Sequence, residues 1–351
     1  MKAILLAGGK GTRLRPLTLH TPKPIVPIFD RPFLQYQIDL LKQVPEIDEV
    51  ILSLNYQPRR LEETFGDGAG LGLRLRYVVE PSPLGTGGAI RYAAQGIDDT
   101  LVVFNGDVMT AVDVAAVVAL HRQRGATATI VLTPVANPSA YGLVETAPDG
   151  RVRRFLEKPS ADEITCDTIN AGIYVLEPRT FDRIPKDVPF SIERGYFPSL
   201  VERKETFVAY VERGYWIDIG TPEKYRDVHR DIFDGRCPLG PTGIAAGAPV
   251  VSPEAKVEPG ATLQGPCFLD AGVVVKAGAT VGPYSVLGRS VLVEEDASVR
   301  GAIVWPNTRI SHAATVDGAL IGRSCHVGRN AHVGPAAILG DKTALTDFTQ
   351  A

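Results

Sequence analysis

The C-terminal third of the chain carries a repeat in which an aliphatic residue returns every six positions. A helix or a coiled coil would give a period of about 3.6 or 3.5 residues, so neither fits. A six-residue period with small residues and glycine between the aliphatic positions is typical of stacked hexapeptide coils. The sequence therefore predicts a left-handed parallel β-helix over 250–351. The unbroken register comprises Val251, Val257, Leu263, Leu269, Val275, Val281, Leu287, Val293 and Val299. It slips by one residue to Val304, Ile310 and Val316, and slips again to Ile321, Val327, Val333 and Leu339.

The preceding part of the chain alternates short apolar runs with amphipathic segments. This alternation predicts an α/β domain with a doubly wound, mostly parallel (Rossmann-like) sheet over 1–234. A mixed sheet that shapes a second binding site is expected between Ala126 and Asp218. A Gly- and Pro-rich segment over 235–249 predicts a linker. The expected strands are Lys2–Leu6, Val50–Leu54, Leu73–Val79 and Leu101–Phe104, and the expected helices are Phe33–Val44 and Asp113–Arg124.

The composition excludes several classes of protein. The 351 residues carry 37 Lys and Arg against 40 Asp and Glu, and this net charge of −3 disfavours a nucleic-acid or membrane-surface partner. No apolar stretch approaches the about 18 residues of a membrane span. Six scattered histidines disfavour a zinc centre. The cysteines, which form no CxxC pair, predict reduced thiols in a cytoplasmic protein; they are Cys166, Cys237, Cys267 and Cys325.

The strongest candidate site is the glycine-rich segment LAGGKGTRLRPLTLHTPKP from Leu6 to Pro24. Its glycines permit a close approach of the backbone to a ligand, and Arg13 and Lys23 supply positive charge for phosphate oxygens. The segment lacks the GxxxxGK[ST] pattern of a P-loop, and Leu14 stands where a dinucleotide fingerprint needs its third glycine. An ordinary strand-to-helix turn with solvated charges remains an alternative at this point.

The order of the motifs resembles the sugar-phosphate nucleotidyltransferase family, and within it most closely the mannose-1-phosphate guanylyltransferases. A hexapeptide-repeat tail is a common appendage in this family. The motifs extend over 1–232 and are GGKGTRLRPLT followed by PKP, GTGGAI (85–90), NGD (105–107), YG (141–142), EKP (157–159), NAG (170–172) and WIDIGTP (216–222).

The resemblance implies transfer of a nucleotidyl group from a nucleoside triphosphate to a sugar 1-phosphate, with GTP and mannose 1-phosphate as the expected pair. The sugar phosphate is already an anion near neutral pH, so cations and a metal are expected to carry the catalysis rather than a strong base. The resemblance assigns Mg²⁺ to Asp107 and Asp218, each of which ends an apolar run. Alternative interpretations are a helix cap for Asp107 and a turn residue for Asp218.

The resemblance also assigns the remaining contacts. Arg13 is expected to bind the β- and γ-phosphates, Lys23 the α-phosphate and Lys158 the phosphate of the sugar. The expected nucleotide-binding residues are Leu6, Ala7, Gly8, Gly9, Gly11, Thr12, Arg13, Glu80, Gly85 and Gly88. The expected sugar-binding residues are Gly142, Glu157, Lys158 and Asn170.

Glu80 favours guanine as the base. A carboxylate can accept two hydrogen bonds at once, and guanine presents N1–H and the 2-amino group side by side, whereas thymine has one such donor. In the thymidylyltransferase branch a glutamine stands at this place. The spacing from Glu80 to Gly85, however, matches the thymidylyl pattern better than that of many guanylyltransferases. A glucose-1-phosphate thymidylyltransferase or another pyrophosphorylase of nucleotide sugars therefore remains an alternative.

Two further alternatives concern the repeat. Hexapeptide β-helices often carry an acyltransferase site with a histidine near a coil interface, and His312, His326 and His332 lie in the repeat. A non-catalytic regulatory subunit that binds a nucleotide sugar is the other alternative. In an enzyme, the coils are expected to support a homo-oligomer, because they offer broad apolar faces.

Overall fold

The computed structural model describes residues 1–244 and 247–351 and contains two compact units. The first unit comprises Met1–Gly9 and Leu34–Asp218, and the second comprises Lys10–Phe33 and Ile219–Ala351. The domain limits that the sequence predicts stay a prediction, and the expected linker includes residues 245–246, which lie outside the described residues. No helix of the described residues is both long enough and apolar enough to span a membrane.

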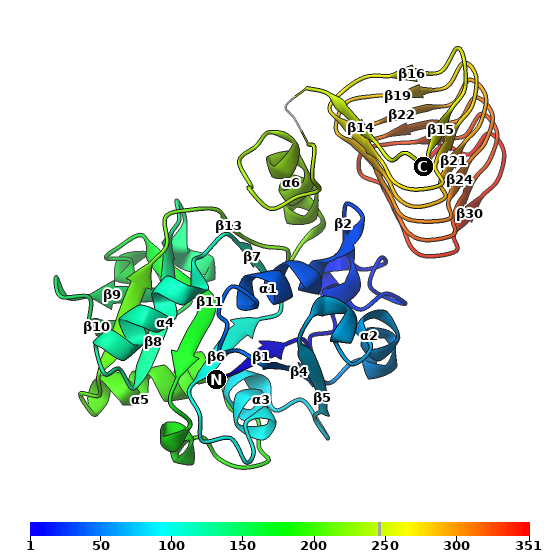
Figure 1. The fold of residues 1–351 in the computed structure, drawn as a ribbon. Coiled ribbons are helices and arrows are strands. Elements are labelled where there is room, and N and C mark those ends of the chain that lie inside the picture. The colour runs from blue at the N-terminus through cyan, green and yellow to red at the C-terminus, as the bar shows by residue number, and fades with distance from the viewer. Residues whose placement is uncertain (245–246) are drawn as a thin grey trace. The chain divides into compact units, whose positions relative to one another are not determined.

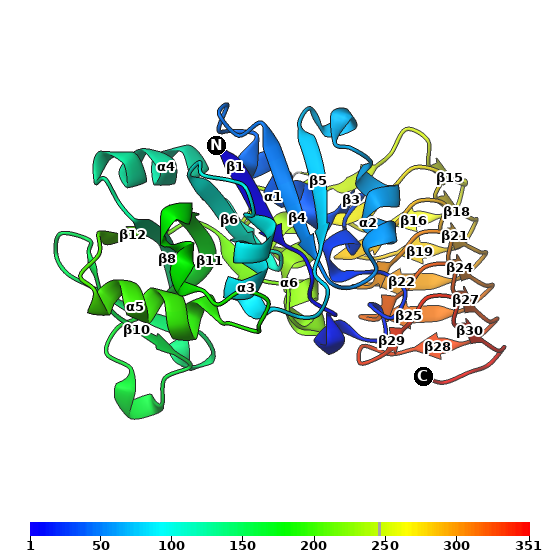
Figure 2. The same ribbon diagram turned by 90° about the horizontal axis from the view of Figure 1, so that it is seen from below.

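The first unit is built on a nine-stranded sheet in which β6, β1, β4 and β5 lie side by side and run parallel (Figures 1 and 2). Its central strands β1 and β4 are apolar runs, because a parallel strand is covered on both faces. The remaining order is β10-β9-β11-β6, with β8 between β11 and β12. The strands are β1 Lys2–Leu6, β4 Glu49–Leu54, β5 Arg74–Val79, β6 Leu101–Asn105, β8 Ala128–Pro134, β9 Gly142–Thr146, β10 Val152–Glu157, β11 Thr168–Leu176 and β12 Phe207–Val211.

The α/β architecture predicted from the sequence is confirmed. The predicted helix over Phe33–Val44 is α-helical to Leu41 and ends in a turn, where the Val44 N–H donates to the Leu41 carbonyl. Asp113 caps the predicted helix that follows it by accepting the Ala116 N–H at 2.9 Å. The described α-helices of this unit are α1 Phe33–Leu41, which begins one residue before the unit does, α2 Pro58–Phe65, α3 Gly85–Ala93, α4 Val114–Gln123 and α5 Phe197–Glu202.

The expected mixed region is also present. β11 runs antiparallel to β6, β8 and β9, and its pairing with β8 shifts between Asn170 and Tyr174. A second, two-stranded sheet pairs β7 (Val108–Thr110) with β13 (Trp216–Asp218). This small sheet contains Asp218 and begins directly after Asp107, the two predicted metal ligands, so it decides the local geometry of the candidate site.

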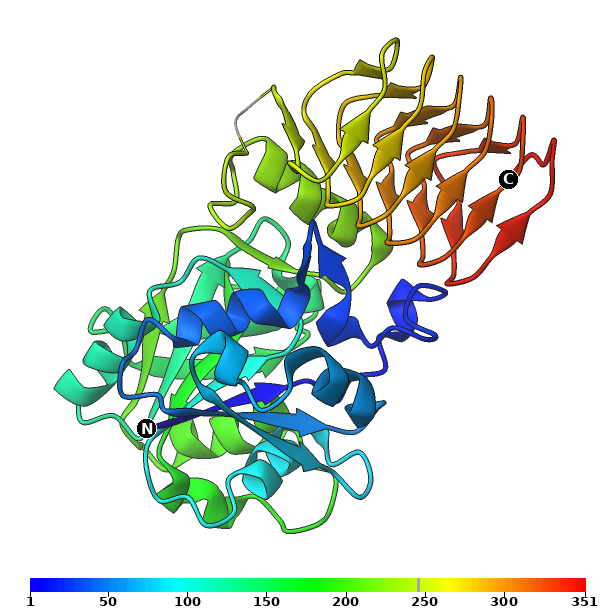
Figure 3. The same ribbon diagram turned by 45° about the vertical axis from the view of Figure 1, so that its right-hand side comes forward.

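The second unit contains three parallel sheets that wind into the predicted left-handed β-helix, with the coils stacked in chain order from yellow to red in Figure 3. The two-residue strands β2 (Pro27–Ile28) and β3 (Arg31–Pro32) and the helix α6 (Pro222–Phe233) complete the unit. The first sheet is β14 Pro249–Val251, β17 Cys267–Leu269, β20 Ser285–Leu287, β23 Ile303–Val304, β26 Leu320–Ile321 and β29 Ile338–Leu339. The second is β15 Lys256–Val257, β18 Val274–Val275, β21 Leu292–Val293, β24 Arg309–Ile310, β27 His326–Val327 and β30 Ala344–Leu345. The third is β16 Thr262–Leu263, β19 Thr280–Val281, β22 Ser298–Arg300, β25 Thr315–Asp317 and β28 His332–Val333.

The register slips in the sequence are shortened corners of this β-helix. Leu269 pairs with Leu287, three six-residue steps later, whereas Leu287 pairs with Val304, one residue sooner. The two slips span Gly301 and Gly318, whose φ angles of 57° and 63° lie in the left-handed region. Glycine adopts that conformation without the steric cost of a side chain, so a tighter corner can form while the aliphatic stack continues.

The helix α6 joins two parts of the second unit. Its Tyr225 hydroxyl donates to the Pro27 carbonyl and accepts the indole N–H of Trp305 at 2.9 Å. Its Phe233 ring lies 4.9 Å from the ring of Phe29, which also contacts the ring of Phe268 at 5.2 Å. The segment 10–33 is therefore packed, through α6 and directly, against the coils of the β-helix.

Candidate active site

The glycine-rich segment leaves the sheet at the carboxyl end of β1, after Leu6. The Ala7 N–H donates to the Ser53 carbonyl at the end of β4 (2.9 Å), which fixes the exit direction. A Cβ at Gly8 would lie 3.1 Å from the Asn55 nitrogen, whereas one at Gly9 would meet no atom within 4 Å. A side chain at Gly8 would therefore crowd the backbone of the protein itself, and Gly9 leaves open space at an edge where α/β sheets bind ligands.

Asp107 and Asp218 are brought together in the first unit. The Gly106 N–H, at the end of β6, donates to the Leu6 carbonyl at 3.0 Å, and Asp107 follows. In the antiparallel pair β13–β7, Asp218 lies opposite Val108, the residue after Asp107. A strand follows Asp107 directly, so the alternative of a helix cap is wrong, and Asp218 is the last residue of a strand.

The donor set at these two residues fits Mg²⁺. Both carboxylates are only partly covered, and one oxygen of Asp218 accepts the Tyr141 hydroxyl at 2.9 Å. Mg²⁺ prefers hard oxygen ligands and typically takes one or two carboxylates together with water and substrate phosphates. Among the described residues no group of three or more His, Cys, Asp and Glu is arranged to hold a metal, so this pair would take its other ligands from water and substrate.

A buried glutamine that the sequence did not single out supports the NGD motif. The Gln37 side-chain amide donates to the Asn105 carbonyl at 2.9 Å and to the Val108 carbonyl at 2.7 Å. These two carbonyls flank Gly106 and Asp107, and Gln37 is 1% exposed. In the sequence, the feature that could have indicated this role is a polar residue, Gln37, within the otherwise apolar face of the first helix.

The predicted sugar-binding residues Gly142 and Glu157 lie opposite each other in β9 and β10. A Cβ at Gly142 would lie 2.8 Å from Phe155 Cζ and 3.0 Å from Glu157 Oε2, so a side chain there would require both of these side chains to move. Burial raises the pKa of the Glu157 carboxyl, and the nearby charge of Glu193 raises it further. The Glu193 carboxylate, which the sequence did not single out, accepts the Thr86 hydroxyl at 2.7 Å.

Tyr141 connects this group to the carboxylate pair. Its carbonyl accepts the Lys158 N–H at 2.9 Å, while its hydroxyl donates to Asp218. Lys158 has a φ of 54° and an exposed side chain, so the chain turns sharply there. The YG motif is identified in the sequence, but a role is predicted there for Gly142 alone, and not for Tyr141.

Asn170 is tied to the turn inside β11. Its side-chain N–H donates to the Tyr174 hydroxyl at 2.9 Å, and its Oδ1 accepts the Gly172 N–H at 2.9 Å. Tyr174 is fully buried, and burial raises the pKa of its hydroxyl well above the ordinary value. The hydroxyl therefore stays protonated beneath Asn170 and helps to fix the amide.

Glu80, the predicted base-reading residue, is 8% exposed and holds its own loop. Its Oε1 accepts the Ser53 hydroxyl at 3.2 Å, and its Oε2 accepts the Leu84 N–H at 2.9 Å. Each carboxylate oxygen has a second lone pair, so these bonds orient the group and leave acceptor capacity for a ligand.

Gly85 and Gly88 are required by protein packing. Gly85 has a φ of 68°, and a Cβ there would lie 2.8 Å from the Phe190 carbonyl oxygen. A Cβ at Gly88 would lie 2.9 Å from the Leu84 Cβ and 3.1 Å from the Val188 carbonyl oxygen. The segment 188–190 thus lies directly against the GTGG turn, which gives these glycines a structural reason independent of any ligand.

The other predicted phosphate-binding residues belong to the second unit. Gly11, with a φ of 59°, precedes a 3₁₀ turn over Thr12–Leu14, and a Cβ there would lie 3.2 Å from the Lys23 Cβ. The Arg13 guanidinium lies against Gly220 of the WIDIGTP motif, where a Cβ would come within 2.7 Å of Nη2. Lys23 is buried, at 8% exposure.

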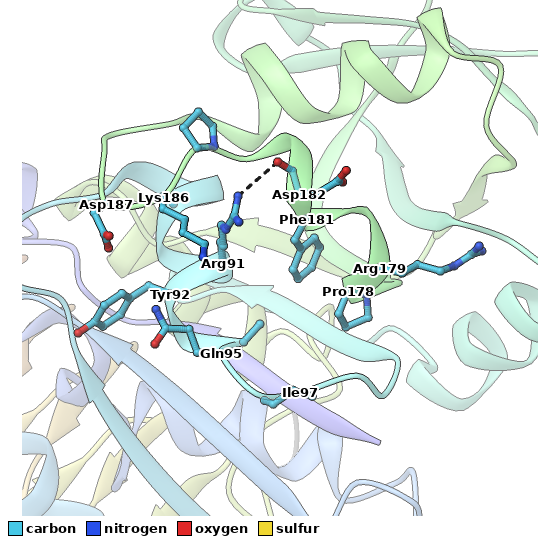
Figure 4. Close-up of a pocket in the computed structure, with 13 residues that line it drawn as sticks. Arg91, Tyr92, Gln95, Ile97, Pro178, Arg179, Phe181, Asp182, Lys186 and Asp187 are labelled. Carbon is cyan, nitrogen blue, oxygen red and sulfur yellow. Dashed lines mark hydrogen bonds between the residues drawn. The ribbon is translucent and has the colours of Figure 1, made fainter.

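A separate pocket lies beside α3 (Figure 4). Its wall contains Arg91 and Tyr92 of α3 and Gln95 just after it, together with Asp182 and Lys186, and Arg91 donates to the Asp182 carbonyl at 3.4 Å. Gly88 is in its wall, but the carboxylate pair and the predicted sugar-binding residues are not. This pocket therefore contains neither the residues expected to bind the metal nor those expected to bind the sugar.

Comparison with known proteins assigns this chain to a family. Residues 2–235 match the model of the nucleotidyl transferase family, and residues 263–349 match that of the GMPPB C-terminal domain. A mannose-1-phosphate guanylyltransferase of Mycobacterium tuberculosis is 41% identical over 83% of this chain and 79% of its own. A UTP–glucose-1-phosphate uridylyltransferase of Synechocystis is 31% identical over 93% and 88%. The structure of HddC from Yersinia pseudotuberculosis complexed with GMP-PN is 30% identical, covers 66% of this chain and 99% of its own, and has a TM-score of 0.56. The chain therefore belongs to the nucleotidyl transferase family.

Proposed function

We propose that this protein is a mannose-1-phosphate guanylyltransferase that converts GTP and mannose 1-phosphate into GDP-mannose and pyrophosphate with the help of Mg²⁺. The observation that carries the proposal is the placement of Asp218 opposite the residue after Asp107, at the carboxyl end of β6 and beside the end of β1. Two hard carboxylates next to a glycine-rich exit suit a metal-bound triphosphate better than an acyl or hydride donor.

The chemical step needs charge stabilisation more than proton transfer. An oxygen of the sugar phosphate attacks the α-phosphorus, and the bond from that phosphorus to the bridging oxygen breaks as pyrophosphate takes the electron pair. Asp107 and Asp218 would hold Mg²⁺, which when bound would neutralise charge on the α-phosphate. Arg13 would bind the β- and γ-phosphates, and Lys23 the α-phosphate.

The sugar phosphate would be held by the group around β9, β10 and β11. Lys158 would bind its phosphate, while Glu157 and Asn170 would bind sugar hydroxyls. The raised pKa of Glu157 suits this role, because a half-buried carboxyl gains from hydroxyl donors that replace its lost hydration. The fixed amide of Asn170, held by Tyr174 and Gly172, would present one orientation to the sugar.

Guanine would be read by Glu80. Its burial and its two bonds within the protein pre-orient the carboxylate, and both oxygens keep a lone pair for N1–H and the 2-amino group. The guanylyltransferase relative at 41% identity favours this base. The uridylyltransferase relative supports the alternative, in which the same site serves another pyrophosphorylase of nucleotide sugars.

A pyrophosphate-release matrix tests the proposal. It pairs GTP, dTTP, UTP, ATP and CTP with the 1-phosphates of mannose, glucose and heptose in the presence of Mg²⁺. GTP with mannose 1-phosphate is expected to give the highest kcat/KM, because two donors on guanine match the Glu80 carboxylate. The absence of turnover with every pair would overturn the enzymatic proposal. A tenfold preference for dTTP or UTP over GTP would overturn only the assignment of the base.

We also propose that copies of the chain associate through the β-helix. The core-facing Val251 and Val257 of the first coil are 39% and 37% exposed, whereas their stacking partners Leu269 and Val275 are fully buried. An edge coil with open aliphatic residues and unpaired strand edges is a surface for self-association. Light scattering at micromolar concentration is expected to give the mass of an oligomer, which Val257→Lys should reduce. A monomeric mass for the unaltered chain would contradict this proposal.

A further inference from the structure

The segment 10–33, which carries Arg13 and Lys23, is anchored on the last coils of the β-helix within the second unit. The Thr21 hydroxyl donates to Asp341 Oδ2 at 3.0 Å. Thr21 is 4% exposed and Asp341 is half-buried, so this bond to a charged acceptor is partly shielded from water and worth more than a fully exposed contact. Asp341 lies between β29 and β30.

A second contact is made by Pro16, which, like Thr21, lies between Arg13 and Lys23 along the segment. A Cβ at Gly340 would come within 3.1 Å of the Pro16 Cβ and 3.4 Å of the Pro16 carbonyl oxygen. The absence of a side chain at Gly340 thus lets Pro16 approach the coil. The neighbouring residues Gly340 and Asp341 therefore form one anchoring point for Pro16 and Thr21.

The anchoring point is itself held rigidly by the coils. Asp341 Oδ1 accepts the Arg323 N–H of the preceding coil at 2.8 Å, while Oδ2 accepts Thr21. Asp347 makes the same bond to the coil, because its Oδ1 accepts the Arg329 N–H at 2.8 Å. No bond from Asp347 to the segment 10–33 exists in the described chain. Asp347 is therefore a matched control for the part of Asp341 that only stabilises the β-helix.

The contact reaches the phosphate-binding residues by a short path. Lys23 lies two residues after Thr21, and a Cβ added at Gly11 would lie 3.2 Å from the Lys23 Cβ and 3.2 Å from the Thr18 Cγ2. The Thr18 hydroxyl, in the same segment, donates to the Gly11 carbonyl at 2.7 Å. A change at Thr21 therefore alters the placement of Lys23 and of the glycine turn together.

We infer that Asp341 is a positioning residue for the triphosphate, acting from the β-helix through Thr21 on the segment that carries Arg13 and Lys23. This inference rests on the proposed function. In this arrangement the β-helix is a support of the nucleotide site as well as a surface for assembly. Loss of the bond between Thr21 and Asp341 affects binding of the triphosphate. It leaves binding of the sugar phosphate unchanged, because the sugar-binding residues belong to the other unit.

The test compares Thr21→Val, Thr21→Ser, Asp341→Ala and Asp347→Ala in the full-length protein. Thr21→Val and Asp341→Ala are expected to raise the KM for GTP about tenfold, since a partly buried hydrogen bond to a charge is lost. The KM for mannose 1-phosphate stays unchanged. Thr21→Ser keeps the hydroxyl and therefore the wild-type KM for GTP. Asp347→Ala also keeps the wild-type KM for GTP, although it loses the bond from Asp347 to the Arg329 N–H. The double variant Thr21→Val/Asp341→Ala is no worse than either single variant.

A second readout does not depend on turnover. Amide hydrogen exchange over 10–24 is expected to accelerate in Asp341→Ala and Thr21→Val but not in Asp347→Ala. Equal exchange and equal KM for GTP in Asp341→Ala and Asp347→Ala would overturn the inference. If the wild-type protein turns over no substrate pair, the proposed function fails instead, and the exchange comparison still decides whether Asp341 orders the segment.

Discussion

Asp107→Asn and Asp218→Asn are each expected to lower kcat by about 100-fold or more, because even outer-shell partners of a metal are typically worth about 10- to 100-fold. Asparagine keeps the size of the side chain but removes the charge that Mg²⁺ prefers. The Mg²⁺ concentration needed for half-maximal activity should rise in both variants. The thermal unfolding midpoint should change little, since both carboxylates are partly exposed.

Asp113→Asn is the matched control for these variants. Asp113 caps α4 through Ala116, and asparagine caps helices about as well as aspartate, so activity and stability should both persist. Full activity of Asp107→Asn or Asp218→Asn would remove that residue from the metal site. A loss of activity that merely follows a loss of folded protein would assign the residue a structural role.

The second unit is expected to lose stability as the pH falls below 6.5, because of a buried histidine on α6. His229 Nδ1 donates to the Tyr225 carbonyl at 2.8 Å, and its Nε2 accepts the Phe29 N–H at 3.3 Å. Burial lowers the pKa of His229 from 6.5 to about 4. The unfolded chain therefore binds a proton between these two pH values while the folded chain does not. The free energy of unfolding should fall by about 2 kcal/mol between pH 7.5 and pH 5.

The chain offers a local probe for this effect. Trp216 and Trp305 are its two tryptophans, and Trp305 lies in the second unit beside Tyr225. In a Trp216→Phe background, Trp305 fluorescence during urea unfolding reports on that unit. His229→Gln, whose amide oxygen can accept the Phe29 N–H and does not titrate, should remove most of the slope between pH 5 and pH 7.5. An unchanged slope in that variant would assign the acid sensitivity to other groups.

The periodic parts of the fold follow from the sequence. Nine aliphatic residues at a fixed spacing of six predict the coils, because a structure with that period turns them all toward the inside of the coil stack. Apolar runs such as Lys2–Leu6 likewise predict buried parallel strands, and the structure has β1 over the same residues. The order of the motifs identifies the family, and the residue types at Asp107 and Asp218 indicate a metal. Each of these inferences needs only the identity, spacing and order of residues along the chain.

The contacts that support the site join residues far apart along the chain, and no local pattern announces them. Gln37 holds the carbonyls on either side of Asp107, and Tyr141 joins Lys158 to Asp218. The bond between Thr21 and Asp341 spans 320 positions. A hydrogen bond of this kind depends on how two distant segments of the chain are placed in space, whereas a periodic pattern depends on one continuous segment. The sequence by itself thus determined the coils, the strands and the chemistry of the candidate ligands. The tertiary structure alone decided which side chains hold those ligands in place, because only packing brings their distant partners within reach.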